Sequence, residues 1–279
     1  MAQEVETYLK RMAEIHGTGA STGETSYYGA LENLLNGIGK TLKPRVICNG
    51  QIHNQGAGHP DFGLYTQAQC SSGVPKEGQG HMPERGVVEV KKLADETWIT
   101  ASTAQVSKYW QLYRLVIVTN YRAFLLIGVD DSGKPVRLES FTLAPSDIAF
   151  WQACAKPKQT ATERGAQFIE FLKRALVQLA PLHRPVDLAW LLASYARDAL
   201  ARVERRSSLA ALAAIRSGLE EALGLKFEGS KGEHFFRSTL VQTLFYGCSR
   251  RGCSGAKSNP LVRRYASIGM RRGGRYACR

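Results

Sequence analysis

The sequence lacks the long apolar runs that cross a membrane. No uninterrupted hydrophobic stretch approaches the roughly 20 residues that a membrane-spanning helix needs. The first 16 residues mix Glu, Lys and Arg with scattered apolar side chains, which is unlike a secretory signal. We therefore expect a soluble, cytoplasmic protein with no membrane partner.

Cysteine is scarce and dispersed, with six residues in a chain of 279. Without a secretory signal, free thiols are expected rather than disulfides, which excludes a small disulfide scaffold. Three histidines and one cysteine of the first half have spacings that fit no closed four-ligand zinc pattern: His53, His59, His81 and Cys70. A structural zinc site is therefore not predicted.

Acidic residues are absent from the last stretch, Cys248 to Arg279, which holds nine Lys and Arg. The formal net charge of the whole chain is +13, so the remaining 247 residues carry only +4. A charge of +4 over that length is a weak indication of nucleic-acid binding. Any such function must rest on a motif.

The same basic stretch also lacks helical periodicity, and a shifted reading frame explains both features. Codons chosen for CSRRGCSGAKSNP and reread one base out of frame give VFSAWVLWGKEQP, which is aromatic and amphipathic. We expect residues 248–279 to be an out-of-frame, disordered tail, in which Cys248 and Cys253 form no metal knuckle. The alternative is a genuine basic, disordered DNA-binding tail.

The first part of the chain has the pattern of an α/β domain with a mixed central sheet flanked by helices. Apolar spacing and turn residues predict helices at 1–15, 25–37 and 97–112, and extended segments at 45–49, 61–66, 86–92, 115–119, 123–129 and 135–143. Thr22 or Thr25 is the candidate cap of the second helix. The segment Gln67 to Arg85, rich in Gly, Pro, Ser and Gln, is predicted to be an exposed loop.

The composition changes after residue 155 toward Ala, Leu, Arg and Glu. The spacing of Leu172, Leu176 and Leu179 is helical, and we predict a bundle of about four helices between 160 and 247. The predicted organisation is an α/β domain at 1–155, a helical linker or coupler at 156–247 and the basic tail at 248–279.

Two carboxylates and a lysine mark the chemistry of the α/β domain. Asp61 follows Pro60 at the start of one extended segment, and Glu89, Val90 and Lys91 lie in the next. Because side chains of a strand alternate between faces, Glu89 and Lys91 point to one side and Val90 to the other. If Asp61 lies on a neighbouring strand, two oxygen ligands and one ammonium group share a single site.

Such a set of groups favours Mg²⁺, which prefers oxygen ligands and retains several waters. In this interpretation Asp61 and Glu89 are ligands and the Val90 carbonyl is a third. The metal polarises a phosphodiester and activates water, while Lys91 orients that water and offsets the charge of the transition state. The alternative is a structural one without catalysis, in which Glu89 and Lys91 form a solvent-facing pair on a strand and Asp61 is a turn residue after Pro60.

The strings around these residues resemble a known family. GHPDFGLYT and GVVEVKK, then Gln105 to Tyr109, LVIVTNYRAFLLIG, ETSYYGALENLLN and HFFRSTLVQTLFYG are similar to the N-terminal region of large fused restriction-modification enzymes of the type ISP kind. Members carry an Mrr-like nuclease of the PD-(D/E)xK type, a helical linker and an adenine-N6 methyltransferase. The resemblance spans nearly Gly23 to Phe245 and implies a restriction-endonuclease-like fold.

The resemblance also implies roles for individual residues. Asp61, Glu89 and Lys91 match the catalytic set, and Glu24 matches the acid near the first core helix, which can join the metal site. Glu32 is the alternative for that acid. Gln105 matches a glutamine whose amide reaches phosphate or the metal-bound water; its alternative is an ordinary exposed helix residue.

Other candidates for nucleic-acid contact have simpler explanations. Five aromatic residues could stack on bases, yet at helical spacing they more often form core: Tyr27, Tyr28, Tyr109, Trp110 and Tyr113. Arg202, Arg205 and Arg206 can touch phosphate, but such a run more often solvates a helix.

The resulting hypothesis is a Mg²⁺-dependent endonuclease domain acting on double-stranded DNA, with the methyltransferase and specificity domains absent from this chain. The sequence lacks an Asn/Asp-Pro-Pro-Tyr/Phe motif and a Gly-rich cofactor loop, so methyl transfer is not expected. The rival is a non-catalytic DNA-binding or coupling module. A remoter rival is a nuclease acting on RNA or on replication intermediates.

Overall fold

The computed structural model describes residues 2–20, 23–73, 80–97, 101–130, 132–178, 185–205 and 210–253. The chain separates into two compact units, Met1–Ala180 and Pro181–Arg279, here called the N-terminal and C-terminal units. The described part contains no helix with the length and apolar character needed to span a membrane.

The N-terminal unit is built on a six-stranded mixed sheet in the order β1-β2-β3-β4-β5-β6. Its strands are β1 (Val46–Gly50), β2 (Phe62–Thr66), β3 (Val87–Val90), β4 (Val116–Thr119), β5 (Ala123–Val129) and β6 (Pro135–Thr142). Only β3 and β4 pair in parallel, and α5 (Ala104–Tyr113) connects them. The predicted α/β class with a mixed sheet is confirmed, and each predicted strand is present within a residue or two of its expected bounds.

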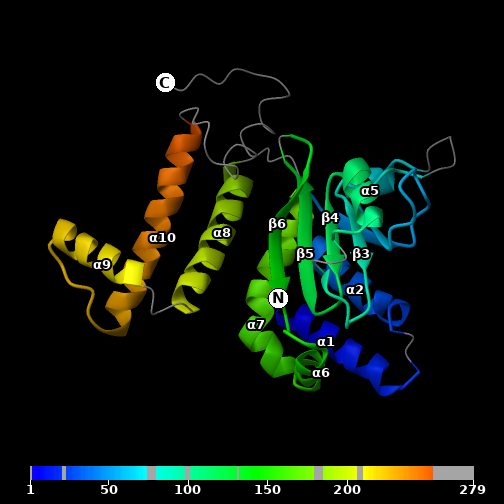
Figure 1. Cartoon of the computed structure of the whole chain (residues 1–279), viewed down its shortest axis with the longest axis horizontal. Coiled ribbons are helices and arrows are strands. Elements are labelled where there is room, and N and C mark those ends of the chain that lie inside the picture. The colour runs from blue at the N-terminus through cyan, green and yellow to red at the C-terminus, as the bar shows by residue number, and fades with distance from the viewer. Residues whose placement is uncertain are drawn as a thin grey trace. The chain divides into compact units, whose positions relative to one another are not determined.

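Helices cover both faces of this sheet (Figure 1). On one face, Val106, Tyr109 and Tyr113 of α5 form a buried cluster with strand residues such as Val87 and Val118. The other layer contains α1 (Ala2–Gly17), α2 (Tyr28–Gly39), α6 (Asp147–Ala155) and α7 (Pro157–Val177), in which α1 packs against the other three. Burial of apolar side chains on both faces explains why β4 is entirely apolar apart from Thr119.

Three local predictions in this unit are wrong. The helix expected at 97–112 is interrupted at 101–103, and α5 begins at Ala104 with Thr103 as its N-cap. A short 3₁₀ helix, η1 (Thr25–Tyr27), precedes α2, so the N-cap residue of α2 is Tyr27 and not Thr25. Thr22, the other candidate, lies outside the described residues. The segment after β2 begins with a helix, α3 (Gln67–Ser71), rather than a loop. Thr66 and Gln69 form a reciprocal capping box there, and the Gln69 amide also donates to the carbonyl of Met82 at 2.6 Å. Gln69 and Arg85 are both buried.

The helix α7 belongs to the N-terminal unit rather than to a separate four-helix bundle. Phe168 of α7 packs its ring against Phe124 of β5 and Phe141 of β6, and the buried Arg174 forms an ion pair with Glu139 of β6. The compact unit therefore extends to Ala180, beyond the expected boundary at 155. The role of the helical segment 156–247 as a linker or coupler stays a prediction.

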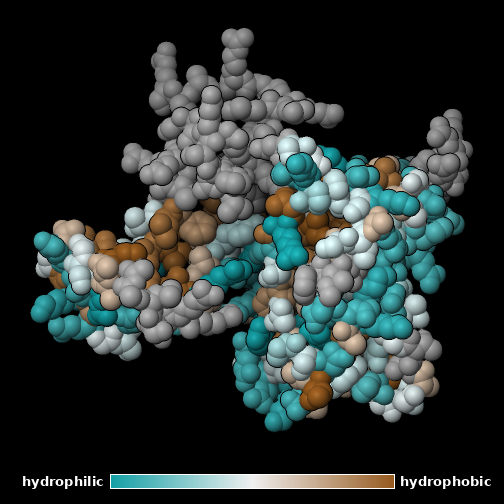
Figure 2. All heavy atoms as spheres, viewed as in Figure 1, coloured by the Kyte–Doolittle hydropathy of each residue, from teal (hydrophilic) through white to brown (hydrophobic). Residues whose placement is uncertain are grey.

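The C-terminal unit consists, in its described part, of α8 (Pro185–Arg205), α9 (Ala210–Leu223) and α10 (Gly229–Cys253). Arg237 of α10 donates to the carbonyls of Val203 and Glu204, which joins α10 to the end of α8. Figure 2 shows apolar side chains at the surface of this unit, and Phe235 and Leu244 are more than half exposed.

The helix α10 runs to Cys253, so the beginning of the segment expected to be disordered is helical. Residues 254–279, with the rest of the predicted tail, lie outside the described residues. The three cysteines whose side chains are described are free thiols, as expected: Cys48, Cys70 and Cys154.

Candidate functional site

The register of β2 and β3 brings Asp61 beside the Glu-x-Lys strand. Phe62 lies opposite Val88 in an antiparallel pair, so Asp61 reaches the last residues of β3. The Oδ2 atom of Asp61 accepts a hydrogen bond from the backbone N–H of Val90 at 2.7 Å. The predicted juxtaposition of Asp61 with this strand is therefore confirmed.

Glu89 and Lys91 share one face, as alternation along the strand predicts. Val87, two residues before Glu89, lies in the cluster with α5, and Lys91 follows the end of β3. The Nζ atom of Lys91 is 2.7 Å from Oε1 of Glu89. The side chain of Glu89 is only 2% exposed, against 27% for Lys91, so the carboxylate is at the buried end of the pair.

The structure distinguishes between the two candidate helix carboxylates. Glu24, which directly precedes η1, has its Oε1 atom 4.0 Å from Nζ of Lys91. Glu32 lies farther along α2 and is close to Cys48, whose pKa is raised by burial and by the charge of Glu32. Glu24 is therefore the acid that stands beside Asp61, Glu89 and Lys91.

Burial and charge perturb the acidic groups of this cluster. Burial raises the pKa of Glu89 to about 7, with the hydrogen bond from Lys91 opposing the rise and the charge of Asp61 adding to it. Burial also raises the pKa of Glu24, again opposed by Lys91 and supported by Asp61. Loss of solvent and, to a smaller extent, the proximity of like charges both favour the neutral acid.

Lys91 remains a cation in this environment. Burial alone would lower the pKa of Lys91, but the hydrogen bond and charge of Glu89 and the charges of Glu24 and Asp61 outweigh burial and raise it. A lysine that keeps its proton can donate hydrogen bonds and offset negative charge, but it cannot accept a proton.

One oxygen of the cluster lacks a partner. Within the described residues, Oε2 of Glu89 is buried and receives no hydrogen bond. Leaving a buried charged oxygen unpaired is costly, and a divalent cation would satisfy it. The described part contains no group of three or more His, Cys, Asp or Glu side chains positioned to hold a metal. Two carboxylates with waters and a backbone carbonyl fit Mg²⁺.

Gln105 lies near the site but its amide has another partner. The side chain is on the exposed side of α5, and its Nε2 atom donates to the hydroxyl oxygen of Tyr109 at 2.8 Å. Burial raises the pKa of Tyr109, the hydrogen bond from Gln105 opposes this rise, and the nearby charges of Glu89 and Asp61 add to it. The structure therefore places Gln105 against Tyr109, and it is Tyr109 that lies near the charges of Glu89 and Asp61.

Two tyrosines that the sequence did not indicate as site residues donate hydrogen bonds to Asp61 and Glu24. The Tyr28 hydroxyl donates to Oδ1 of Asp61, and burial together with this bond raises the pKa of Tyr28 far above its usual range. The Tyr121 hydroxyl donates to the backbone carbonyl of Glu24. Both residues have the sequence context of core or turn positions, and their spacing along the chain contains no signal of these long-range contacts.

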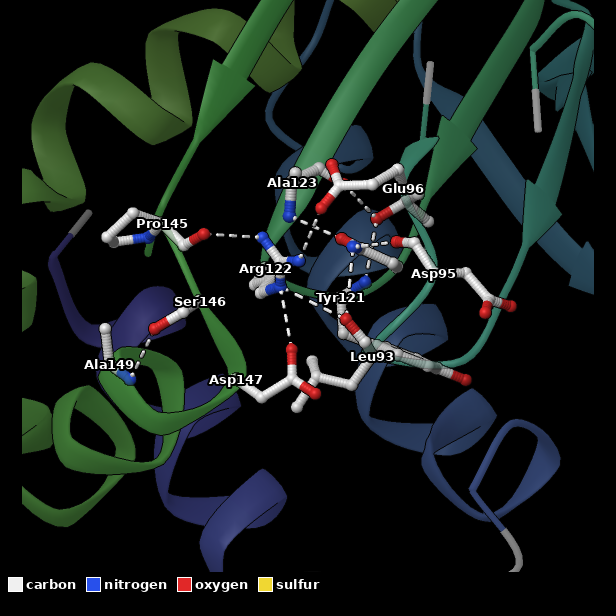
Figure 3. A network of polar contacts seen from close by, with 12 residues as sticks. Leu93, Asp95, Glu96, Tyr121, Arg122, Ala123, Pro145, Ser146, Asp147 and Ala149 are labelled. Carbon is white, nitrogen blue, oxygen red and sulfur yellow. Dashed lines mark hydrogen bonds and ion pairs between the residues drawn. The ribbon is translucent and has the colours of Figure 1, made fainter. Parts of the chain in front are cut away.

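The turn between β4 and β5 anchors the segment that follows Lys91 (Figure 3). The Asn120 side chain donates to the carbonyls of Leu93 and Asp95 at 3.2 and 2.6 Å and accepts from the Ala123 N–H at 2.8 Å. From the same turn, Arg122 donates to the carbonyls of Leu93 and Pro145 and forms ion pairs with Glu96 and Asp147. This buried network fixes the backbone next to the catalytic candidates.

Comparison with known proteins finds little at the level of sequence: no family model and no curated protein matches the chain. Among solved structures, the electron cryomicroscopy structure of a DrdV–DNA complex is similar, at 18% identity and a TM-score of 0.37. The match covers 57% of this chain and 98% of that chain. A likeness of this size assigns no function to the chain.

Proposed function

We propose that the N-terminal unit is a Mg²⁺-dependent endonuclease domain that hydrolyses phosphodiester bonds of double-stranded DNA. The observation that carries this proposal is that Asp61, Glu89 and Lys91 lie together at the end of β3, where Oε2 of Glu89 is buried and has no partner in the described structure. The proposal is also supported by the resemblance of the sequence to fused restriction-modification enzymes.

The residues present fit a divalent cation. Asp61 and Glu89 would hold it through carboxylate oxygens and Val90 through its carbonyl, and Glu24, which lies beside Lys91, would be the further acid of the site. When bound, the ion supplies positive charge that polarises the scissile phosphate and lowers the pKa of water. Coordination by few protein oxygens and several waters is the usual arrangement for Mg²⁺ at phosphate-processing sites.

Lys91 supplies the second positive charge. Because its pKa is raised, it remains protonated and can orient the attacking water by hydrogen bonding and stabilise charge that develops on the phosphate oxygens. Glu89 holds Nζ of Lys91 at 2.7 Å, which limits the positions open to the ammonium group. Gln105 is exposed, and its amide would reach a phosphate or a bound water only by leaving the hydroxyl of the buried Tyr109.

The test is cleavage of supercoiled plasmid DNA by the full chain with Mg²⁺, compared with Asp61→Asn and Lys91→Ala. Both variants are expected to lose at least about 100-fold in rate, because each removes a group that acts on the transition state. Lys158→Ala, which removes an exposed lysine of α7, is the matched control and should cut like the wild type.

The outcomes separate the candidate functions. Equal cutting by Asp61→Asn would place the chemistry elsewhere and overturn the assigned site. Binding of the cation without cleavage of any DNA would favour the rival, a non-catalytic DNA-binding or coupling module of a larger enzyme. Cleavage of RNA or branched DNA in preference to duplex DNA would identify a different substrate class.

A further inference from the structure

Both oxygens of Asp61 are held by hydrogen-bond donors from different elements. Oδ2 accepts from the backbone N–H of Val90 in β3, and Oδ1 accepts from the hydroxyl of Tyr28 at the start of α2. A carboxylate restrained at both oxygens has one orientation rather than a range of rotamers. The bond from Val90 comes from the sheet itself, so the Tyr28 hydroxyl is the side-chain contribution to this restraint.

Tyr28 is itself fixed by the local structure. Its ring packs against Phe62, with ring centroids 5.1 Å apart, and Phe62 is the residue after Asp61. Tyr28 also follows η1 directly, and the residue that precedes η1 is Glu24. The short helix η1 and the start of α2 therefore place Glu24 near Lys91 and the Tyr28 hydroxyl against Asp61.

We propose that Tyr28 is a positioning residue of this site, whose hydroxyl orients Asp61 for a divalent cation. A neutral donor leaves the negative charge of the carboxylate in place, and Oδ1 retains a second lone pair that can face a cation. The contact pre-orders the ligand before the cation arrives, so less rotamer freedom is lost on binding. The inference rests on the proposed function, since it assigns Asp61 as a ligand.

The experiment uses Tyr28→Phe in the full chain, which removes the hydroxyl and keeps the ring on Phe62. Titration with MgCl₂ or MnCl₂ in the absence of DNA, followed by calorimetry, measures cation affinity directly. Loss of one hydrogen bond to a charged ligand group predicts a cation affinity lower by on the order of tenfold. In cleavage assays the Mg²⁺ concentration for half-maximal rate should rise by a similar factor, while the rate at saturating Mg²⁺ falls much less.

Tyr113→Phe is the matched control. The Tyr113 hydroxyl is buried in α5 without a hydrogen-bond partner in the described structure, so its removal should leave cation affinity unchanged. Urea unfolding of both variants without cation reports the purely structural effect. If the Tyr28 hydroxyl only stabilises the fold, Tyr28→Phe has a lower urea midpoint and wild-type cation affinity, and that result overturns the inference.

The two hypotheses fail in different ways. If the wild-type protein binds the cation and Tyr28→Phe binds it equally well, the positioning role is wrong and the proposed function stands. If the wild-type protein binds no divalent cation, and Asp61→Asn behaves identically, the proposed function itself is wrong. A Tyr28→Phe protein that cuts DNA with an unchanged Mg²⁺ requirement would also contradict the positioning role.

Discussion

Glu89 is the residue of the site whose burial destabilises the fold and whose carboxylate is a proposed cation ligand. Its carboxylate is almost completely buried, with one oxygen bound to Lys91 and the other without a partner in the described structure. Burying a charged group without full compensation destabilises a fold. A neutral isostere at this position would be less costly, so the presence of a carboxylate accords with its proposed role as a cation ligand.

Replacement of this carboxylate by its neutral isostere should stabilise the metal-free protein. We expect Glu89→Gln to raise the free energy of unfolding at pH 8 by roughly 1–3 kcal/mol, because the charged form no longer has to be buried. Added Mg²⁺ should stabilise the wild type and not the variant. Urea unfolding with and without Mg²⁺ measures both effects, and a destabilised variant would argue that the charged pair with Lys91 is itself the stabilising element.

The raised pKa of Glu89 also predicts a pH dependence. The folded protein holds this proton up to about pH 7, whereas the unfolded chain releases it near the ordinary value of 4.5. The contribution of Glu89 to stability is therefore fully present below about pH 4.5 and is lost as the pH rises through 7. In the metal-free protein the difference in stability between Glu89→Gln and the wild type should widen across this window. A pH-independent difference, measured by urea unfolding at pH 5 and pH 8, would contradict the assignment.

Sequence could predict part of this site at the level of residues. Alternation along a strand is local, so the shared face of Glu89 and Lys91 follows from their spacing alone. The contact of Tyr28 with Asp61 joins residues 33 positions apart and depends on how α2 packs on β1. No periodicity records such a contact, and for that reason the spacing of Tyr28 indicates only a stacking or core residue.

At the scale of elements, the β4–β5 turn links the sheet to the segment after Lys91. Asn120, fully buried, satisfies two carbonyls and one N–H of two different segments. The extended segments predicted at 115–119 and 123–129 leave only three residues for a connecting turn, but the sequence contains no indication that the turn is internal. Turns are usually at the surface, and only tertiary packing decides which turn is buried.

Loss of the Asn120 amide should therefore be costly. Asn120→Ala removes the two hydrogen bonds to the carbonyls of Leu93 and Asp95 and the one from the Ala123 N–H, although Arg122 still donates to the Leu93 carbonyl. We expect the free energy of unfolding to fall by about 2 kcal/mol. Ser132→Ala is the control from the β5–β6 turn, where the side chain bonds to Asp130 at the surface, and it should cost under about 0.5 kcal/mol. Equal effects of the two changes in urea unfolding would show that the turn network does not stabilise the fold.

The capping box after β2 illustrates the opposite case, in which the sequence does contain a local signal. Thr66 followed three residues later by Gln69 is the sequence pattern of a helix start. Pro, Gly and Ser elsewhere in the segment favour a loop and mask that signal. The buried Gln69 then organises the return of the chain toward β3 through its bonds to Met82 and Thr66.

At the scale of the whole molecule, periodicity predicts helices but not their partners. The apolar face of α7 has the same spacing whether it packs in a helical bundle or on a sheet, so the boundary expected at 155 has no physical signal behind it. The aromatic contacts of Phe168 with β5 and β6 decide its place in the N-terminal unit. The mixed sheet itself is predictable, because strand length, turn residues and the helix between β3 and β4 together imply it.

Net charge is the property of the whole chain that is most unevenly distributed. Residues 254–279 contain seven Lys and Arg and no acid, so a chain that ends at Cys253 would carry +6 instead of +13. A basic segment of this kind attracts DNA whatever its origin, because neutralised phosphates release counterions. Its charge is separate from the groups proposed to cut DNA, which lie between Glu24 and Lys91.

Deletion of residues 254–279 should consequently separate binding from cleavage. We expect weaker binding to duplex DNA and a shallower dependence of affinity on salt, with the slope reduced by about 0.9 for each phosphate that is no longer neutralised. The cleavage rate at saturating DNA and Mg²⁺ should stay within about twofold of the full chain, since no proposed site residue is removed. Fluorescence anisotropy between 50 and 200 mM salt and plasmid cleavage measure the two quantities. An unchanged salt slope would mean that these residues do not touch DNA, whereas a much slower rate at saturation would make them part of the catalytic apparatus.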